Sequence, residues 1–485
     1  MRYIRILFCI LLLLSTHDAW AQRLITYEEA MRTAIESNPA LISSRYSEEK
    51  AKSSLLSAKG IFDPTFGLNG TWEAPKIVVI PGLSANNERQ GWNVNSNISG
   101  SLGTGTSYVL SGYFNRGISR FPNSTFFGDQ DAFDVQAHLS LTQQMLKGHR
   151  LAYNIQTITT ARSSHDIAGI SVDRTEQSTL AETAGAYWNW VHQVRLAEIA
   201  DDAVSLAEEG LRVGELQVEA GELAEVERTR LQAALVQAQA EALDAHHAAQ
   251  SAADTLFLLL GEQPGQTALP ATKIGIIPDL HIDGQAALAV AIEQNVELAM
   301  GRANLAAAEL TRSNSRHGRL PSLSATAEAG VSSTHDRELS GEEVFQGLGE
   351  TARPYWAISS NFSVPLGNRS ARGEAASAAS DVHIRQNELE ELTRSVSSNL
   401  QAQVRMLMSS AQRVSLAEAN VRLAEATLRA EEERVREGVR IHKDALEARN
   451  GVAQARAAAI KARIDYRLAQ VELLHVQGQL TVELP

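Results

Sequence analysis

This chain has very little cysteine and few aromatic side chains. Among its 485 residues there is a single cysteine, Cys9, and aromatic residues make up only 5%. One cysteine excludes an internal disulfide, so stability must come from packing and assembly. A compact globule of this length usually needs more aromatic bulk in its core, whereas thin helical layers packed through small side chains do not.

The chain also lacks long hydrophobic runs, apart from one at its start. Arg2 and Arg5 precede an apolar stretch, and Ala19 and Ala21 form a small-residue cleavage site, so residues 1–21 are predicted to be a secretory signal peptide. Cys9 would be removed with it. Beyond residue 21 there is no run of 18 apolar residues that predicts a transmembrane helix. Membrane insertion as a β-barrel remains compatible with this sequence, because the alternating strands of a barrel give a much weaker hydrophobic signal than a transmembrane helix does.

Basic charge and convergent catalytic side chains are lacking as well. The formal charge of −13 argues against nucleic acid as a partner. The 13 histidines are scattered, and the adjacent His246 and His247 point in different helical directions. Gly103 and Gly105 lie between predicted strands with no helix after them, unlike a dinucleotide-binding loop. We therefore expect no cofactor and no metal site.

Proline is absent between Pro122 and Pro264 and again between Pro365 and Pro485. These gaps hold four predicted long helices, at about 160–219, 222–262, 372–437 and 440–479. At 1.5 Å per residue the third would be roughly 100 Å long. Apolar residues recur every seven positions, which predicts coiled-coil packing: Ile199, Leu206 and Val213 in one helix, and Leu400, Leu407, Val414, Val421, Leu428 and Val435 in another.

What the chain does have is an internal repeat. Residues 34–68 recur 257 positions later as residues 291–325, with Asn38 matching Asn295 and Pro64 matching Pro321. We therefore expect two structural repeats after the signal peptide, residues 22–278 and 279–485.

Each repeat also contains alternating sequence that predicts β-strands. Four such segments lie in the first repeat and two in the second: 65–71, 92–102, 107–114, 134–141, 323–331 and 355–364. Aromatic residues gather in and beside them, as in the girdles of a membrane barrel. A soluble β-sandwich is the alternative, but faces rich in Ser, Asn, Thr and Gly favour the barrel.

In this order, the motifs resemble the TolC family of outer-membrane efflux proteins over essentially the whole mature chain. The marks are the helix–Asn38-Pro39–helix opening, the Leu320-Pro321-Ser322-Leu323 start of a strand, and the exit from a strand at 363–368. Two further marks are glycines that join the long helices in pairs, Gly221 and Gly438.

The resemblance implies a mixed α and β fold. It implies a homotrimer in which a 12-stranded outer-membrane β-barrel continues into a periplasmic α-helical coiled-coil barrel. Such a protein is not an enzyme: it is a passive exit duct of a tripartite efflux or type I secretion system in a Gram-negative bacterium. Its partners are outer-membrane lipid, a periplasmic adaptor (membrane fusion) protein and an inner-membrane pump. One departure is that the first repeat has four strand-like segments where the family has two, so either the strands are interrupted or a hairpin projects outward.

The helical tips are where the resemblance places functional residues. Asp444 and Glu447 would form acidic rings at the pore constriction, and Arg440 would pair with Glu227 or another carboxylate to hold the tube shut. Because the two carboxylates are three apart, they should share one face of a helix. The turn residues are candidate contacts for the adaptor: Gly221, Glu222, Leu223, Gly438 and Val439.

The rival readings come from other classes of protein. A secreted trimeric coiled-coil adhesin or periplasmic scaffold would share the seven-residue repeats, but it predicts neither a barrel nor a duplicated order of helix and strand. A periplasmic hydrolase would need a convergent polar site. An adaptor has helical hairpins too, but usually one, between compact β-domains. The transported substrate is not readable from the sequence.

Overall fold

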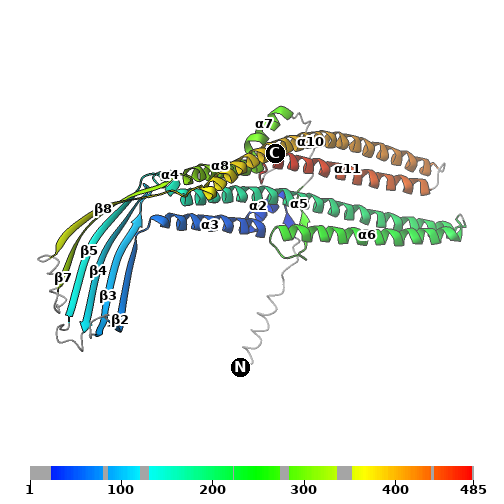
Figure 1. Cartoon of the computed structure of the whole chain (residues 1–485). Coiled ribbons are helices and arrows are strands. Elements are labelled where there is room, and N and C mark those ends of the chain that lie inside the picture. The colour runs from blue at the N-terminus through cyan, green and yellow to red at the C-terminus, as the bar shows by residue number, and fades with distance from the viewer. Residues whose placement is uncertain are drawn as a thin grey trace, which may run out of the picture. The chain divides into compact units, whose positions relative to one another are not determined.

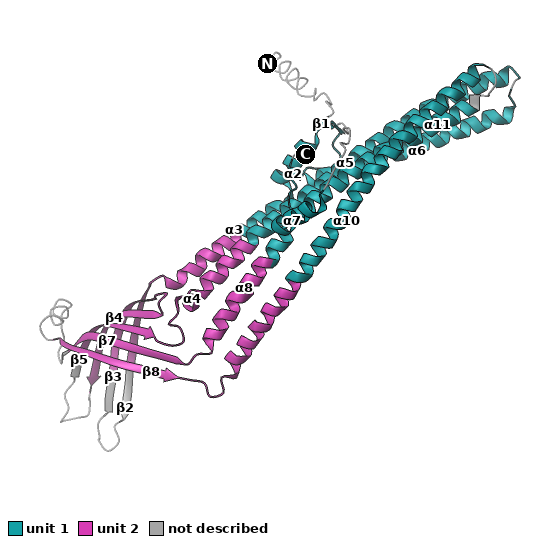
Figure 2. Ribbon diagram, turned by 90° about the horizontal axis from the view of Figure 1, so that it is seen from above, with its two compact units in different colours: residues 1–48, 168–301, 389–485 teal, residues 49–167, 302–388 magenta. Residues whose placement is uncertain are grey.

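The computed structural model describes residues 23–79, 86–120, 130–221, 223–272, 283–335, 352–437 and 442–482. The chain divides into two compact units, each built from several separate segments (Figure 2). One comprises residues 1–48, 168–301 and 389–485, and the other comprises residues 49–167 and 302–388. Each unit therefore draws on both sequence repeats.

The second of these units contains one antiparallel sheet of six strands (Figure 1). All six predicted strand segments are confirmed to within a residue at their ends or as part of a longer strand. Their order in the sheet is β2-β3-β4-β5-β7-β8. The strands are β2 (Thr65–Val79), β3 (Asn86–Ser101), β4 (Thr106–Arg120), β5 (Gln130–Gln144), β7 (Ser322–His335) and β8 (Arg353–Ser363).

The predicted 12-stranded trimeric barrel, which would take four strands from each chain, stays a prediction. The sheet has six, and the additional pair β3 and β4 lies inside it, between β2 and β5. It is not a hairpin that projects outward from an otherwise four-stranded wall. A tight turn makes this placement achievable, because Gly105 adopts a φ of +80° and Leu102 is hydrogen bonded to Thr106 across the turn.

The long helices are confirmed close to their predicted bounds. They are α5 (Gln156–Glu219), α6 (Glu225–Leu259), α10 (Arg369–Arg436) and α11 (His442–Gln477). Shorter helices precede them: α2 (Tyr27–Ser37), α3 (Pro39–Lys59), α4 (Leu151–Asn154), α7 (Gly284–Gln294) and α8 (Val296–Gly318). Two short strands, β1 (Arg23–Ile25) and β6 (Ala268–Pro270), pair in parallel. Of the described helices, none has an apolar stretch long enough to cross a membrane.

The sequence repeat is also visible in matching hydrogen bonds. Asn38 caps α3 by accepting from the backbone of Leu41, and its amide donates to the Leu259 carbonyl at 2.8 Å. Asn295 caps α8 by accepting from Leu298 and donates to the Val476 carbonyl, also at 2.8 Å. In each repeat one asparagine thus fixes the break between two helices and ties it to the end of the returning long helix.

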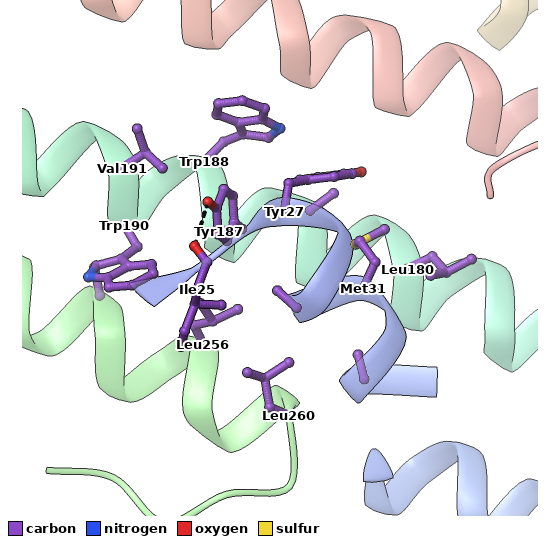
Figure 3. Close-up of a cluster of buried hydrophobic side chains, with 14 of the residues drawn as sticks. Ile25, Tyr27, Met31, Leu180, Tyr187, Trp188, Trp190, Val191, Leu256 and Leu260 are labelled. Carbon is purple, nitrogen blue, oxygen red and sulfur yellow. Dashed lines mark hydrogen bonds between the residues drawn. The ribbon is translucent and has the colours of Figure 1, made fainter. Parts of the chain in front are cut away.

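The unit formed by residues 1–48, 168–301 and 389–485 contains a buried aromatic cluster (Figure 3). Tyr187 and Trp190 are at most 1% exposed and lie against Tyr27 and Leu256. The Tyr187 hydroxyl is 3.0 Å from the Ile25 carbonyl and 2.8 Å from the Thr272 hydroxyl. Tyr187, Trp188 and Trp190 are therefore packing residues rather than a ligand site.

The seven-residue repeat in α10 is buried unevenly. Leu400 and Leu407 are 1% exposed and Val414 is 4% exposed, within a second core that includes Tyr466. Val421, Leu428 and Val435, nearer the end of the helix, are only half-buried. The repeat therefore supplies a core in its first part and a partly uncovered apolar row in its second.

Candidate functional site

The first helical tip is a short turn between α5 and α6. Gly221 has a φ of +79°, as predicted for a left-handed cap. Its amide donates to the Val218 carbonyl, and the amide of Leu223 donates to the Gln217 carbonyl at 3.2 Å. Glu222 lies outside the described residues. A Cβ atom added at position 221 would have no described atom within 4 Å beyond its neighbours in the chain.

The second tip joins α10 to α11. Gly438, Val439 and Arg440 fall outside the described residues. Asp444 is in the first turn of α11 and half-buried, and Glu447 follows it three positions later and is exposed. Because both are within one helix at this spacing, they lie on the same face, as predicted.

Glu227 occupies the first turn of α6. Its carboxylate is 2.8 Å from the guanidinium of Arg230, three residues further along the same helix. The expected pairing with Arg440 stays a prediction, because Arg440 is not among the described residues. Within the described part of the tip, Glu227 thus has a local partner on its own helix.

A ladder of ion pairs joins α10 to α11, and the sequence reasoning missed it. Arginines on α11 and glutamates on α10 both recur every seven residues, so the signal was present in the sequence. The pairs are Glu432–Arg449 at 2.9 Å, Glu425–Arg456 at 2.9 Å and Glu418–Arg463 at 2.7 Å. These partners are largely solvated, so each pair contributes only about 0.2–1 kcal/mol, but together they fix the register of the hairpin.

Residues that pair across neighbouring strands project to the same side of the sheet. Grouped in this way, the side chains give the β-sheet one apolar and one polar face. Its apolar face runs across all six strands. Its members are Phe66, Leu68, Trp72, Trp92, Val94, Ile98, Leu110, Phe114, Phe133, Val135, Leu139, Leu141, Leu323, Val331, Trp356, Ile358 and Phe362. The opposite face carries Asn69, Asn93, Asn95, Asn97, Ser111, Asn115, His138, Ser140, Thr326, Glu328, Ser359 and Asn361.

Aromatic rings on the apolar face form a row across neighbouring strands. Trp72 is paired with Trp92, and Trp92 stacks on Phe114 with ring centres 4.9 Å apart. Phe114 in turn meets Phe133 edge-on at 6.2 Å, and the Arg116 guanidinium lies 5.0 Å from the Phe133 ring centre. Such a row is the arrangement expected of an aromatic girdle.

The chain leaves β5 for α4 by a turn that needs no proline, unlike the junction at Pro365. The amide of Met145 donates to the Leu323 carbonyl at 2.8 Å, and Gly148 has a φ of +87°. The Gly148 amide also donates to Nε2 of His317 at 3.2 Å. This ring is 7% exposed, and its pKa is lowered first by burial and then by His149, Arg150 and Lys147. His317 therefore acts as a neutral acceptor that supports the turn.

His317 should make stability depend on pH. In the folded protein the pKa of His317 is lower than its usual value of 6.5. The stability that this residue contributes is therefore fully present above pH 6.5 and is lost as the pH falls through the folded-state pKa. We expect the thermal midpoint to fall more steeply between about pH 7 and 5 in the parent protein than in His317→Gln, whose side chain can accept without titrating. His383→Gln, at an exposed histidine, is the control. Parallel profiles for the parent and His317→Gln would contradict the role of His317.

Comparison with known proteins gives one family match. Residues 287–479 match the model of a family described as outer membrane efflux protein. Over these residues the chain is similar to the outer membrane efflux proteins, the family that its sequence motifs also resemble. No relative was found among curated proteins.

Solved structures agree on the fold. The chain is similar to the CmeC outer membrane channel of Campylobacter jejuni, at 14% identity and a TM-score of 0.67, covering 93% of this chain and 85% of CmeC. It is also similar to VceC of Vibrio cholerae, at 15% identity and a TM-score of 0.65, covering 93% of this chain and 96% of VceC. A third similar structure is the open state of MtrE of Neisseria gonorrhoeae, at 17% identity and a TM-score of 0.60, covering 93% of this chain and 88% of MtrE.

The match of residues 287–479 to the efflux-protein family supports a general role and location. The protein is a passive exit duct for efflux in the outer membrane of a Gram-negative bacterium, extending into the periplasm, and it is not an enzyme. Within the described ranges, no group of three or more His, Cys, Asp or Glu side chains is placed to hold a metal ion.

Proposed function

We propose that this efflux duct is a homotrimer in which the sheets of three copies join edge to edge in the outer membrane. The supporting observation is the six-stranded sheet itself, which has an apolar face across every strand. Within the described part of the chain, its two edge strands, β2 and β8, each pair on one side only. Open edges leave backbone groups without partners in lipid, at a cost of several kcal/mol each. Pairing β8 of one copy with β2 of the next would satisfy them.

The helices would form the periplasmic part of the duct. The half-buried row of Val421, Leu428 and Val435 supports this assignment, because a seven-residue apolar row is suited to a helix from a neighbouring copy. Residues 22–278 and 279–485 would act as two equivalent repeats within each chain, following a signal peptide at residues 1–21. A secreted trimeric adhesin would also use such helices, but it has no use for a sheet with a lipid-facing side.

The tips would carry the gate and the docking site. Three copies would place Asp444 and Glu447 in acidic rings at a narrow aperture, which attract cations and repel anions. Arg440, paired with Glu227 or another carboxylate, would hold the aperture closed. A periplasmic adaptor that binds the opened tips better, through Gly221, Glu222, Leu223, Gly438 and Val439, would shift the equilibrium toward the open state and connect the duct to an inner-membrane pump.

Planar-bilayer recording of the detergent-purified full chain tests this proposal. We expect a trimer by native mass spectrometry and discrete conductance steps, and Arg440→Ala should enlarge the conductance because a closing contact is lost. Arg405→Ala, at an exposed position on α10 away from the tip, is the matched control. A protein that stays soluble without detergent and gives no conductance would instead support the adhesin. Unchanged conductance in Arg440→Ala would reject the gate alone.

A further inference from the structure

The additional hairpin β3–β4 is an integral part of the sheet. Strand β2 pairs with β3, β3 with β4 and β4 with β5, all in antiparallel register. Among the described strands, β2 is therefore joined to the rest of the sheet only through this hairpin. If β2 belongs to a membrane wall, β3 and β4 must belong to it too.

The two faces of the sheet continue through the hairpin without a break. On the apolar side, Ile98 of β3 pairs with Leu110 of β4, which pairs with Leu139 of β5. On the polar side, Asn97 pairs with Ser111, which pairs with His138. A hairpin projecting into water would have no reason to keep a lipid-type face in phase with its neighbours.

The turn of the hairpin is anchored at the end of the sheet where the helices attach. The side-chain amide of Asn154 donates to the carbonyls of both Gly103 and Gly148, at 3.0 and 2.7 Å. The backbone amide of Gln144 donates to the Gly105 carbonyl at 3.0 Å. These bonds tie the β3–β4 turn to the junction between β5 and α4, so the hairpin is fixed at its base.

We propose that each chain contributes all six strands to the wall, so that the trimer closes an 18-stranded barrel rather than a 12-stranded one. This inference rests on the proposed trimeric membrane channel. Since barrel diameter grows roughly linearly with strand number, the exit would be about half again as wide and roughly twice as large in cross-section. The inserted strands line it with uncharged polar side chains such as Asn95, Asn97 and Ser111.

A wider exit changes where selection by size takes place. Barrels of about 16–18 strands enclose an open aqueous channel. The outer-membrane segment would then admit bulky or polymeric hydrophilic cargo. The narrow acidic aperture proposed at the helical tips would be the step that limits passage.

Single-cysteine accessibility in intact outer membranes tests the inference, since the only cysteine of the chain is in the predicted signal peptide. Ser111→Cys and Leu110→Cys probe the two faces of β4. His138→Cys and Leu139→Cys, their paired positions on β5, are the matched controls. The probe is a charged, membrane-impermeant thiol reagent. We expect the polar-face cysteines to react and the apolar-face ones to react at least about tenfold more slowly, because a thiolate is disfavoured in lipid.

The controls separate the two proposals. If the β5 positions differ in this way but Leu110→Cys and Ser111→Cys react equally fast, the hairpin is outside the membrane wall and the 18-stranded barrel is rejected, while the channel stands. If the β5 positions also react equally, the sheet is not in the membrane, and the proposed channel fails together with the inference.

Discussion

Replacing Gly105 by alanine should greatly lower the amount of correctly assembled trimer in the outer membrane. Gly105 has a φ of +80°, which costs an L-residue roughly 1–2 kcal/mol. A Cβ atom there would also collide with the carbonyl oxygen of Gly148, which is backbone and cannot swing aside. The turn would have to leave its anchor at the β5–α4 junction, and the pairing of β4 with β5 would be disturbed. The amount of heat-resistant trimer in membranes measures this effect.

Gly221→Ala is the matched control for that substitution. Its φ of +79° imposes the same conformational strain, but no described atom lies within 4 Å of the added Cβ. We expect a loss of only about 1 kcal/mol and nearly normal trimer levels. Equal losses in Gly105→Ala and Gly221→Ala would mean that strain alone is responsible and that the anchoring of the β3–β4 turn contributes little.

Neutralising both carboxylates near the second tip should remove most of the cation selectivity of the channel. In a trimer, Asp444→Asn with Glu447→Gln would eliminate two rings of three charges at the aperture. Because a charged constriction concentrates counter-ions about tenfold or more, we expect the cation-to-anion permeability ratio to fall by about that factor. The reversal potential in a salt gradient across a planar bilayer measures the ratio.

Glu391→Gln is a suitable control for charge, since it removes an exposed carboxylate on α10 far from the tip. It should leave the reversal potential nearly unchanged. If Glu391→Gln lowers selectivity as much as the double variant does, selectivity comes from the charge of the whole lumen rather than from Asp444 and Glu447.

Much of the fold could be predicted because its signals are local. The proline-free stretches predicted α5, α6, α10 and α11 to within a few residues, since a long helix tolerates no interior proline. Alternating side chains predicted all six strands. The repeated asparagines, Asn38 and Asn295, marked helix breaks whose hydrogen bonds the structure confirms.

The features that could not be predicted depend on contacts between distant residues. Alternation shows that a segment is a strand, but it does not show which strand it pairs with, so the position of β3–β4 between β2 and β5 was not readable. His317 and Gly148 are 169 residues apart, and nothing near either residue signals their contact. The Glu–Arg ladder of α10 and α11 differs, because its two seven-residue spacings can be read in the sequence. The tip assignments of Arg440, Asp444, Glu447 and Glu227 remain proposals.

The most direct test of the account is cryo-electron microscopy of the full-length protein purified in detergent. The account predicts a threefold particle with one continuous hollow lumen and an end-on ring of eighteen strands, six from each copy. A monomer, or a trimeric rod with a closed helical core and three separate sheets, would contradict the channel itself. A hollow trimer with a ring of twelve strands would keep the channel and reject the widened exit.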